Sequence, residues 1–187
     1  MPSVGPQMAT VGTGANWTNP NNVGSATLYA SESFEMNGGS PPAHDYEAYI
    51  SLNGTTTVGT NKAANASWTE SAVDQTWGSD SELWGRSWSL ADVKGNANFA
   101  IALAVSDDGP SVITSYIFAK GFDFSAIPDG STIAGVSFTA SRKETDIVPG
   151  VATGSADVRN VRCTVTYTES GGGGGGTANN LLLLGVG

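Results

Sequence analysis

Large apolar residues recur at every second position over short runs along almost the whole chain, and turn sequences separate these runs. The clearest runs are residues 46–52 (YEAYISL), 99–105 (FAIALAV) and 158–168 (VRNVRCTVTYT). Successive side chains of a β-strand point to opposite faces, so this spacing is typical of strands. The spacing of an amphipathic helix is nearly absent. The pattern therefore predicts an all-β protein.

Turn sequences indicate how neighbouring runs pair. Asn53-Gly54, a dipeptide that favours tight hairpin turns, joins the first run to residues 55–58. Residues 107–110 (DDGP) have the chemistry of a turn and join the second run to residues 112–119. We therefore expect two antiparallel hairpins. Because alanines alternate with large apolar residues in the second run, we expect that strand to be buried on both faces.

Two further features concern the C-terminal half of the chain. The apolar positions between Ile133 and Ala140 shift by one residue near Gly135. An inserted residue changes the face that later side chains use, so this shift predicts a β-bulge. Cys163 lies among alternating apolar residues of the last run, and we expect it to be a small buried core residue. A chain with a single cysteine has no intrachain disulfide.

One short helical turn is expected among the strands. Ser89 is placed as its N-cap, Asp92 as the acid of a capping box and Gly95 as the residue that ends it. Many short strands with frequent turns are typical of a two-sheet protein. We therefore predict an all-β fold, an antiparallel, jelly-roll-like β-sandwich with one helical turn and extended N- and C-terminal arms.

The predicted organisation is an N-terminal arm (residues 1–15), a β-sandwich domain (residues 16–169) and a C-terminal linker with a docking peptide (residues 170–187). Six glycines begin this last segment, and four adjacent leucines lie close to its end. Adjacent leucines are unfavourable in water, so we expect the segment to dock onto a partner. The predicted docking residues are Leu181, Leu182, Leu183, Leu184 and Val186.

The free energy of burying these leucines indicates how the segment docks. Four buried leucines contribute about 6–12 kcal/mol. Ordering the backbone costs ~1 to 2 kcal/mol per residue, which exceeds that gain over residues 171–187. Backbone pairing with a neighbouring sheet or with copies of the segment would supply the missing hydrogen bonds. We therefore expect a homo-oligomer, with a trimer as the favoured state.

The charge of the chain argues against two classes of partner. The formal net charge is -9 and the eight basic residues are scattered, so phosphate backbones and anionic membranes are repelled. We expect no nucleic-acid binding. The run Leu181 to Leu184 is far shorter than the ~20 apolar residues that cross a bilayer, so we expect no membrane insertion. The N-terminal sequence has neither the basic nor the apolar region of a signal peptide.

Residues suited to catalysis or metal binding are sparse. His44 is the only histidine and is expected in a surface loop, and no serine lies in a nucleophile-elbow sequence. The candidate calcium ligands do not follow the spacing of a known calcium loop; they are Asp74, Asp80, Glu82, Asp107 and Asp108. We predict no enzymatic activity, no catalytic residue, no metal and no cofactor.

Four of the five tryptophans lie between residues 68 and 88, and this block has two interpretations. The rings of Trp68, Trp77, Trp84 and Trp88 can form a stacking platform for sugars, because acidic residues surround them. Alternatively, the rings pin a long loop to the sandwich. We favour the second interpretation, because the block leads directly into the buried run 99–105.

Several segments resemble a β-sandwich module of tailed-bacteriophage virion and tail-associated structural proteins. They include residues 16–22 (NWTNPNN), 78–85 (GSDSELWG), the pattern Trp88-x-x-Ala91-Asp92-Val93, Asn98-Phe99, residues 122–136 and residues 158–168. The resemblance covers most of residues 15–168. Here the segment 111–143 follows the segment 46–105, whereas the usual module has the reverse order.

The resemblance implies a non-enzymatic virion component, either a capsid decoration or head fibre or a tail-associated appendage. Its expected location is the virion exterior, after production in the host cytoplasm. Its expected partners are other virion proteins and copies of itself. The alternative from the tryptophan block is a carbohydrate-binding module or adhesin that contacts host-surface glycans.

Overall fold

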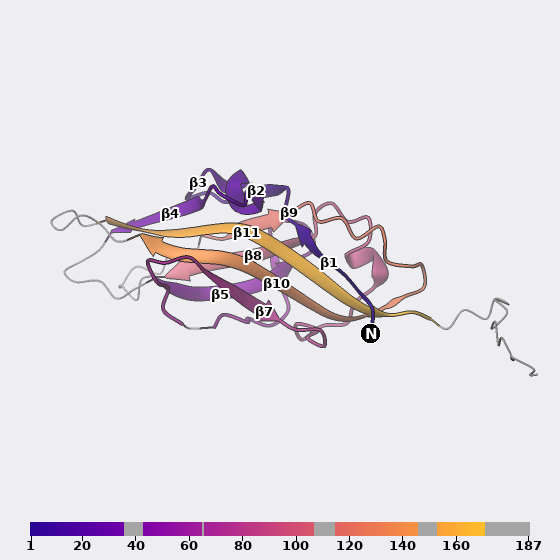
Figure 1. The fold of residues 1–187 in the computed structure, drawn as a ribbon. Helices are drawn as coiled ribbons and strands as arrows, with labels where there is room; N and C mark the ends of the chain where they lie inside the picture. The colour runs from indigo at the N-terminus through magenta and orange to yellow at the C-terminus, as the bar shows by residue number, and fades with distance from the viewer. Residues whose placement is uncertain (36–42, 65, 107–114, 146–152, 171–187) are drawn as a thin grey trace, which may run out of the picture.

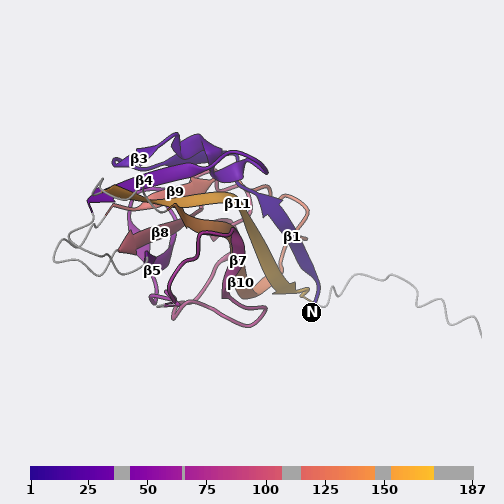
Figure 2. The same ribbon diagram turned by 60° about the vertical axis from the view of Figure 1, so that its left-hand side comes forward.

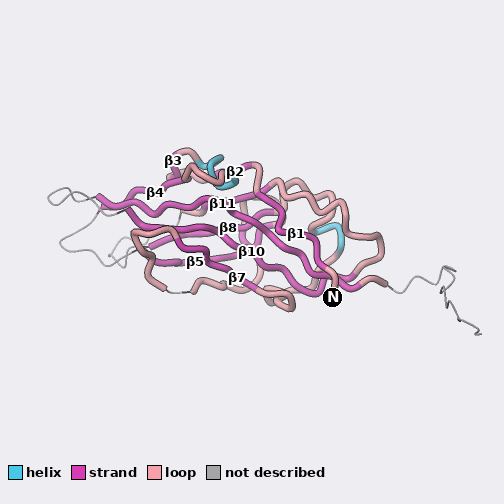
Figure 3. The backbone as a smooth tube through the Cα atoms, in the orientation of Figure 1, coloured by secondary structure: helices cyan, strands magenta, loops and turns pink. Residues whose placement is uncertain are grey.

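Strands make up most of the protein in the computed structural model, which describes residues 1–35, 43–64, 66–106, 115–145 and 153–170. The strands are β1 (Ser3–Met8), β2 (Val11–Thr13), β3 (Trp17–Thr18), β4 (Ala30–Glu35), β5 (His44–Ser51), β6 (Thr57–Val58), β7 (Val73–Gly78), β8 (Ala100–Ser106), β9 (Ile117–Lys120), β10 (Thr132–Thr145) and β11 (Thr153–Thr168). Within the described residues, the helical segments are the short 3-10 turns η1 (Pro20–Gly24) and η2 (Leu90–Asp92), shown in Figure 3.

The strands form two antiparallel sheets. Sheet A has the order β3-β4-β11-β10-β7. β4 and β1 pair with the same edge of β11: β4 with residues 153–158 and β1 with residues 162–166. Sheet B has the order β2-β9-β8-β5-β6. Apolar residues from both sheets form one buried cluster between them, and Figures 1 and 2 show the arrangement from two directions. The predicted antiparallel β-sandwich is confirmed.

Several local predictions are confirmed as well. β5 pairs with β6 as predicted, but Ser51 lies opposite Thr57, so residues 52–56 form a longer loop than the tight turn expected at Asn53-Gly54. Every residue of β8 is buried. β8 pairs with β9, which begins at Ile117; the predicted turn and the first residues of the predicted strand lie outside the described residues. Ser89 and Asp92 form a capping box at η2. The pairing of β10 with β11 shifts between Ile133 and Gly135, which is the predicted bulge.

Aromatic rings fill much of the space between the sheets. The rings of Trp77 and Trp84 stack on Phe138, with centroids 4.6 and 5.6 Å away. Phe99 meets Phe124 edge to face. Cys163 is fully buried, as predicted, and burial raises the pKa of its thiol. The core therefore depends on stacked indole and phenyl rings as well as on aliphatic residues.

Strands form within the segment predicted as an N-terminal arm. β1 pairs with β11, where Ser3 lies opposite Thr166, and β2 pairs with β9 in sheet B. The chain therefore enters sheet A beside the residues at which β11 ends. Figure 1 shows the N-terminus next to the end of β11 that precedes residue 171. Residues 1–2 and 169–170 therefore lie at the same end of the sandwich.

The bulge in β10 brings its backbone against the loop after β7. A Cβ atom added at Gly135 would overlap the backbone of Asp80 and Ser81, and the amide of Val136 donates to the carbonyl of Glu82 at 3.0 Å. We expect Gly135→Ala to lower the free energy of unfolding by about 1–3 kcal/mol, because backbone cannot move aside as a side chain can. Urea denaturation measures the change.

The exposed Thr132, also in β10, provides the control for this prediction. Thr132→Ala should change the free energy of unfolding by less than about 0.5 kcal/mol. Equal stabilities of the two variants would show that the close approach at Gly135 is not needed.

Candidate functional site

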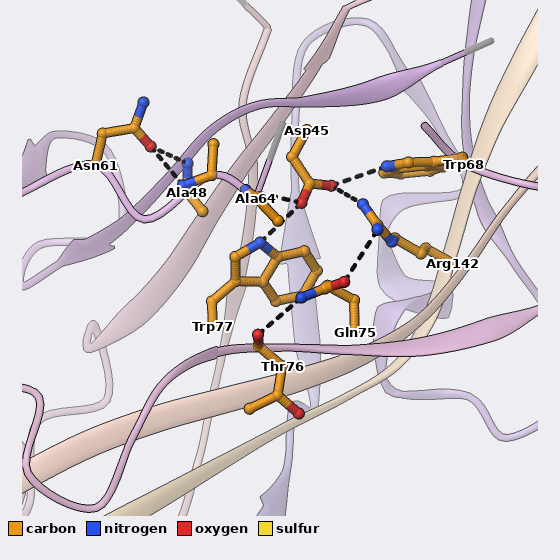
Figure 4. Close-up of polar contacts among 10 residues, drawn as sticks. Asp45, Ala48, Asn61, Ala64, Trp68, Gln75, Thr76, Trp77 and Arg142 are labelled. Carbon is orange, nitrogen blue, oxygen red and sulfur yellow. Dashed lines mark hydrogen bonds and ion pairs between the residues drawn. The ribbon is translucent and has the colours of Figure 1, made fainter. Parts of the chain in front are cut away.

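A buried polar cluster surrounds Asp45 at the start of β5, and Figure 4 shows its members. The pairing of β5 with β8 shifts between Asp45 and Glu47, and Asp45 lies opposite the core residue Val105. We call this the Asp45 cluster; it consists of Asp45, Trp68, Gln75, Trp77 and Arg142. Its residues come from β5 of sheet B, from β7 and β10 of sheet A, and from the segment that precedes β7.

The carboxylate of Asp45 accepts four hydrogen bonds. Its Oδ1 atom accepts from Trp68 Nε1 at 2.8 Å and from the guanidinium of Arg142. Its Oδ2 atom accepts from Trp77 Nε1 at 2.9 Å and from the amide of Ala64 at 3.3 Å. A carboxylate has about four lone-pair sites. The acceptor capacity of Asp45 is therefore used within the protein.

Arg142 completes the cluster from β10. Its side chain is 7% exposed and that of Asp45 is 0% exposed, so the ion pair lies away from water. A second guanidinium nitrogen donates to Gln75 Oε1 at 3.0 Å. The guanidinium carbon lies 5.3 Å from the ring centroid of Trp68 and 5.8 Å from that of Trp77, within the range of cation–π attraction.

These contacts indicate a structural role for the cluster. The charges of Asp45 and Arg142 neutralise each other, and their polar groups bond to neighbours in both sheets. The cluster contains no serine, cysteine or histidine to act as a nucleophile. A substrate would have to break a buried ion pair to reach the carboxylate, which is costly. The cluster can hold the two sheets in one register.

Three of the four candidate glycan-contact tryptophans are core residues. Trp68, Trp77 and Trp84 are 3%, 2% and 0% exposed. Trp84 Nε1 donates to the carbonyl of Val136 at 2.8 Å, and the other two indoles bond to Asp45. These rings have no face open to a sugar. The structure thus supports the interpretation that indole rings pin the loop to the sandwich.

Trp88 differs from the other three because it is partly exposed. Its Nε1 atom donates to the carbonyl of Leu83 at 3.0 Å. The guanidinium of Arg86 lies 4.6 Å from its ring centroid, and Phe99 meets it edge to face. The four tryptophans therefore do not come together on one open surface.

The other site predictions are placed as follows. The docking residues Leu181 to Leu184 and Val186 lie outside the described residues, as do Asp107 and Asp108. Within the described part of the chain, no group of three or more His, Cys, Asp or Glu side chains is arranged to hold a metal ion.

The remaining candidate calcium ligands have protein partners. Hydrogen bonds, first from Ser141 and then from Arg162, lower the pKa of Asp74. The carboxylate of Glu82 forms an ion pair with Lys62 at 2.8 Å, and that hydrogen bond is the main cause of its lowered pKa. Asp80 accepts from the hydroxyl of Thr166 at 3.4 Å. Each of these three carboxylates therefore bonds to a different part of the protein, and they do not form one shared site.

The prediction that His44 lies in a surface loop is wrong. His44 is the first residue of β5, pairs with Ser106 of β8 and is 8% exposed. The two prolines before it suggested a loop, but the alternating pattern of β5 begins two residues earlier than expected. The β-bridge between His44 and Ser67 also covers this position.

Sequence reasoning also missed Glu32, a buried acid. Glu32 lies in β4 between Trp17 of β3 and Ala156 of β11, and its side chain is 0% exposed. Neither carboxylate oxygen has a hydrogen-bond partner among the described residues. Burial raises the pKa of Glu32 to about 8. Glu32 is therefore mostly protonated at neutral pH in the folded protein.

Comparisons with known proteins add no identification. A scan against protein-family models, a search of curated proteins and a search of solved structures each returned no match for this chain. No helix within the described residues has the length and apolar character needed to cross a membrane. The function must therefore be inferred from the arrangement of the protein's own residues.

Proposed function

We propose that this chain is a non-enzymatic structural protein of a bacteriophage virion. It acts as a capsid decoration, head fibre or tail-associated appendage, with the sandwich displayed on the exterior and the terminal extensions attached to the particle. The observation that carries this proposal is the pairing of Ser3 in β1 with Thr166 in β11. This pairing places the first strand beside the last residues of β11, so attachment at that end would leave the rest of the sandwich free for display.

The segments that resemble the phage module support the proposal by their positions. Residues 16–22 form β3 and most of η1, and residues 158–168 form most of β11. Residues 78–85 form the loop whose Glu82 carbonyl accepts from Val136 of β10. The resembling segments are thus parts of one sandwich. The Asp45 cluster suits such a role, because it stabilises the contact between the sheets.

Attachment through residues 171–187 is the part of this proposal that is most directly testable. We expect deletion of these residues to remove most of the protein from purified particles while leaving the sandwich folded. Because the described sandwich ends at residue 170, the deletion leaves β11 and its partners intact. Quantitative mass spectrometry of particles, with circular dichroism of the isolated protein, measures both results.

A length-matched variant is the control for this deletion. It carries serine at Leu181, Leu182, Leu183 and Leu184 and should be lost from particles to a similar extent if those leucines dock. Full incorporation of both variants would disprove docking through this segment. Absence of the unmodified protein from particles would instead disprove the virion role itself.

Self-association is proposed to accompany attachment, with a trimer as the favoured state. Several copies on one symmetric particle bring their terminal segments to a high effective concentration, which strengthens each weak contact. The net charge of -9 disfavours close approach of whole sandwiches. The terminal segments are therefore the proposed sites of contact between copies.

A further inference from the structure

The outer face of sheet B contains three alanines that are buried without belonging to the core. Ala100, Ala102 and Ala104 are each 0% exposed. They alternate along β8 with Ile101, Leu103 and Val105, which belong to the core cluster, whereas the alanines do not. The alanine methyl groups therefore point away from the sheet interface, and side chains on the outer face must cover them.

Pairing register identifies the residues that cover the alanines. Ala102 lies between Tyr49 of β5 and Phe118 of β9. Ala104 lies opposite Glu47, and Tyr116 immediately precedes Ile117, the partner of Leu103. The register therefore places Tyr116 on the other side of Ala104 from Glu47.

One hydrogen bond shows how Tyr116 is oriented. Its hydroxyl donates to the carboxylate of Glu47, although β8 lies between the strands that carry the two residues. Neighbouring strands are about 4.8 Å apart, so the two backbones are separated by about 10 Å. The tyrosine must extend over Ala104 to make this bond. The tyrosine side chain therefore covers the alanine and stays partly exposed.

Tyr49, Tyr116 and Phe118 form an aromatic platform on the outer face of sheet B. All three are partly exposed, and the rings of Tyr116 and Phe118 have centroids 5.7 Å apart and planes inclined by 46°. Burial and the neighbouring Glu47 raise the pKa of Tyr116, so its hydroxyl remains a donor. Glu47, at one edge of the platform, supplies a carboxylate acceptor. Lys120 lies two residues after Phe118, on the same face of β9, and pairs with Ala100.

We propose that this aromatic platform binds a neutral glycan. Aromatic faces suit the apolar face of a pyranose ring, while Glu47 and Lys120 supply an acceptor and a donor for its hydroxyl groups. A site with apolar surface and a few polar groups has the composition of small-ligand sites in general. The net charge of -9 disfavours a second copy or an anionic polymer as the occupant.

This proposal goes beyond virion attachment, since it assigns a ligand to the displayed domain, and it does not require attachment to be correct. It also differs from the tryptophan-loop hypothesis, because the rings belong to β5, β9 and the residue before β9. The outer face of sheet B and the terminal segments are separate parts of the chain. Each can therefore be tested alone.

The first experiment applies the labelled, full-length protein to a printed array of neutral and acidic oligosaccharides. We expect binding to neutral glycans. Titration calorimetry with the best-bound neutral oligosaccharide then compares the protein with Phe118→Ala, for which we expect affinity to fall by about tenfold or more. Because alanine also uncovers Ala102, Phe118→Leu is the second variant. It retains an apolar cover, removes the ring and should show a similar loss with little change in Tm.

Two variants outside the platform are the controls. Leu28→Ala removes a 59% exposed apolar side chain elsewhere, and Trp88→Ala removes the partly exposed indole. Both should bind like the unmodified protein. Two array results would overturn the proposal: no binding at all, or preferential binding to acidic glycans. Loss of binding in Trp88→Ala with normal binding in Phe118→Leu would also overturn it. Sedimentation that shows a dimer disrupted by Phe118→Leu would also overturn it, in favour of contact between copies.

Discussion

Urea denaturation of Arg142→Ala is expected to show a free energy of unfolding about 3–5 kcal/mol below that of the unmodified protein. The substitution leaves the carboxylate of Asp45 fully buried and without its counter-charge. It also removes the donor to Gln75 and the cation beside the rings of Trp68 and Trp77. A loss of this size is a large part of the stability of a typical domain.

Arg162→Ala is the matched control, because it removes the same side chain from the neighbouring strand β11. Arg162 pairs with Asp74 at 2.6 Å, but their side chains are 27% and 50% exposed. An exposed pair contributes about 0–1 kcal/mol, so this variant should be nearly as stable as the unmodified protein. Equal losses in the two arginine variants would contradict the role given to the Asp45 cluster.

A double variant distinguishes the ion pair from simple loss of packing. If Asp45 and Arg142 act as a pair, Asp45→Ala with Arg142→Ala should cost less than the sum of the two single changes. In the double variant neither charge remains buried alone. Strictly additive losses would show that the two side chains stabilise the protein independently.

Glu32→Gln is expected to make the protein more stable than the unmodified form at pH 7 to 8, by an amount that shrinks as the pH falls toward 4.5. Folded Glu32 keeps its proton up to about pH 8, whereas the unfolded chain releases it near the ordinary value of 4.5. The contribution of protonated Glu32 to the free energy of unfolding is therefore fully present below the unfolded pKa of 4.5. It is lost as the pH rises through the folded pKa of about 8. One proton changes stability by up to about 1.4 kcal/mol per pH unit in that window.

Denaturation curves measured from pH 4 to pH 9 for both proteins check this expectation, and the difference between them removes the contribution of other groups. Glu82→Gln is the control with opposite sign. The pKa of Glu82 is lowered, so its ion pair with Lys62 stabilises the fold above the ordinary pKa and is lost on acidification. A flat difference curve for Glu32→Gln would mean that Glu32 is not buried without a partner.

Features that depend on neighbouring residues were predictable from the sequence. The pairing of β5 with the strand that follows it, the capped turn at Ser89 and the shift near Gly135 depend on local sequence, which one stretch of the chain contains. Burial of both faces of β8 was predictable because alanine and larger apolar residues alternate there. The all-β class followed from many such stretches.

The polar sites were not predictable, because they depend on residues far apart in the chain. The Asp45–Arg142 pair joins residues 97 positions apart, and an aspartate after a histidine in a polar segment looks exposed. Glu32 follows Ala30 on one face of β4, but a carboxylate is rarely buried without a partner, so its residue type indicated an exposed position. The platform position of Tyr116 depends on register with β8, and the pairing of β1 depends on β11.

The pairing of β1 with β11 also limits when the protein can fold during synthesis. β1 and β4 are among the first strands made, yet both pair in sheet A with β11, which is made last of all the strands described. Pairing between distant segments is slow, since a long chain loop must close first. The ribosome therefore has to synthesise β11 before β1 and β4 can join the rest of sheet A. Until then, the apolar residues of these early strands depend on other contacts or on chaperones for protection from aggregation.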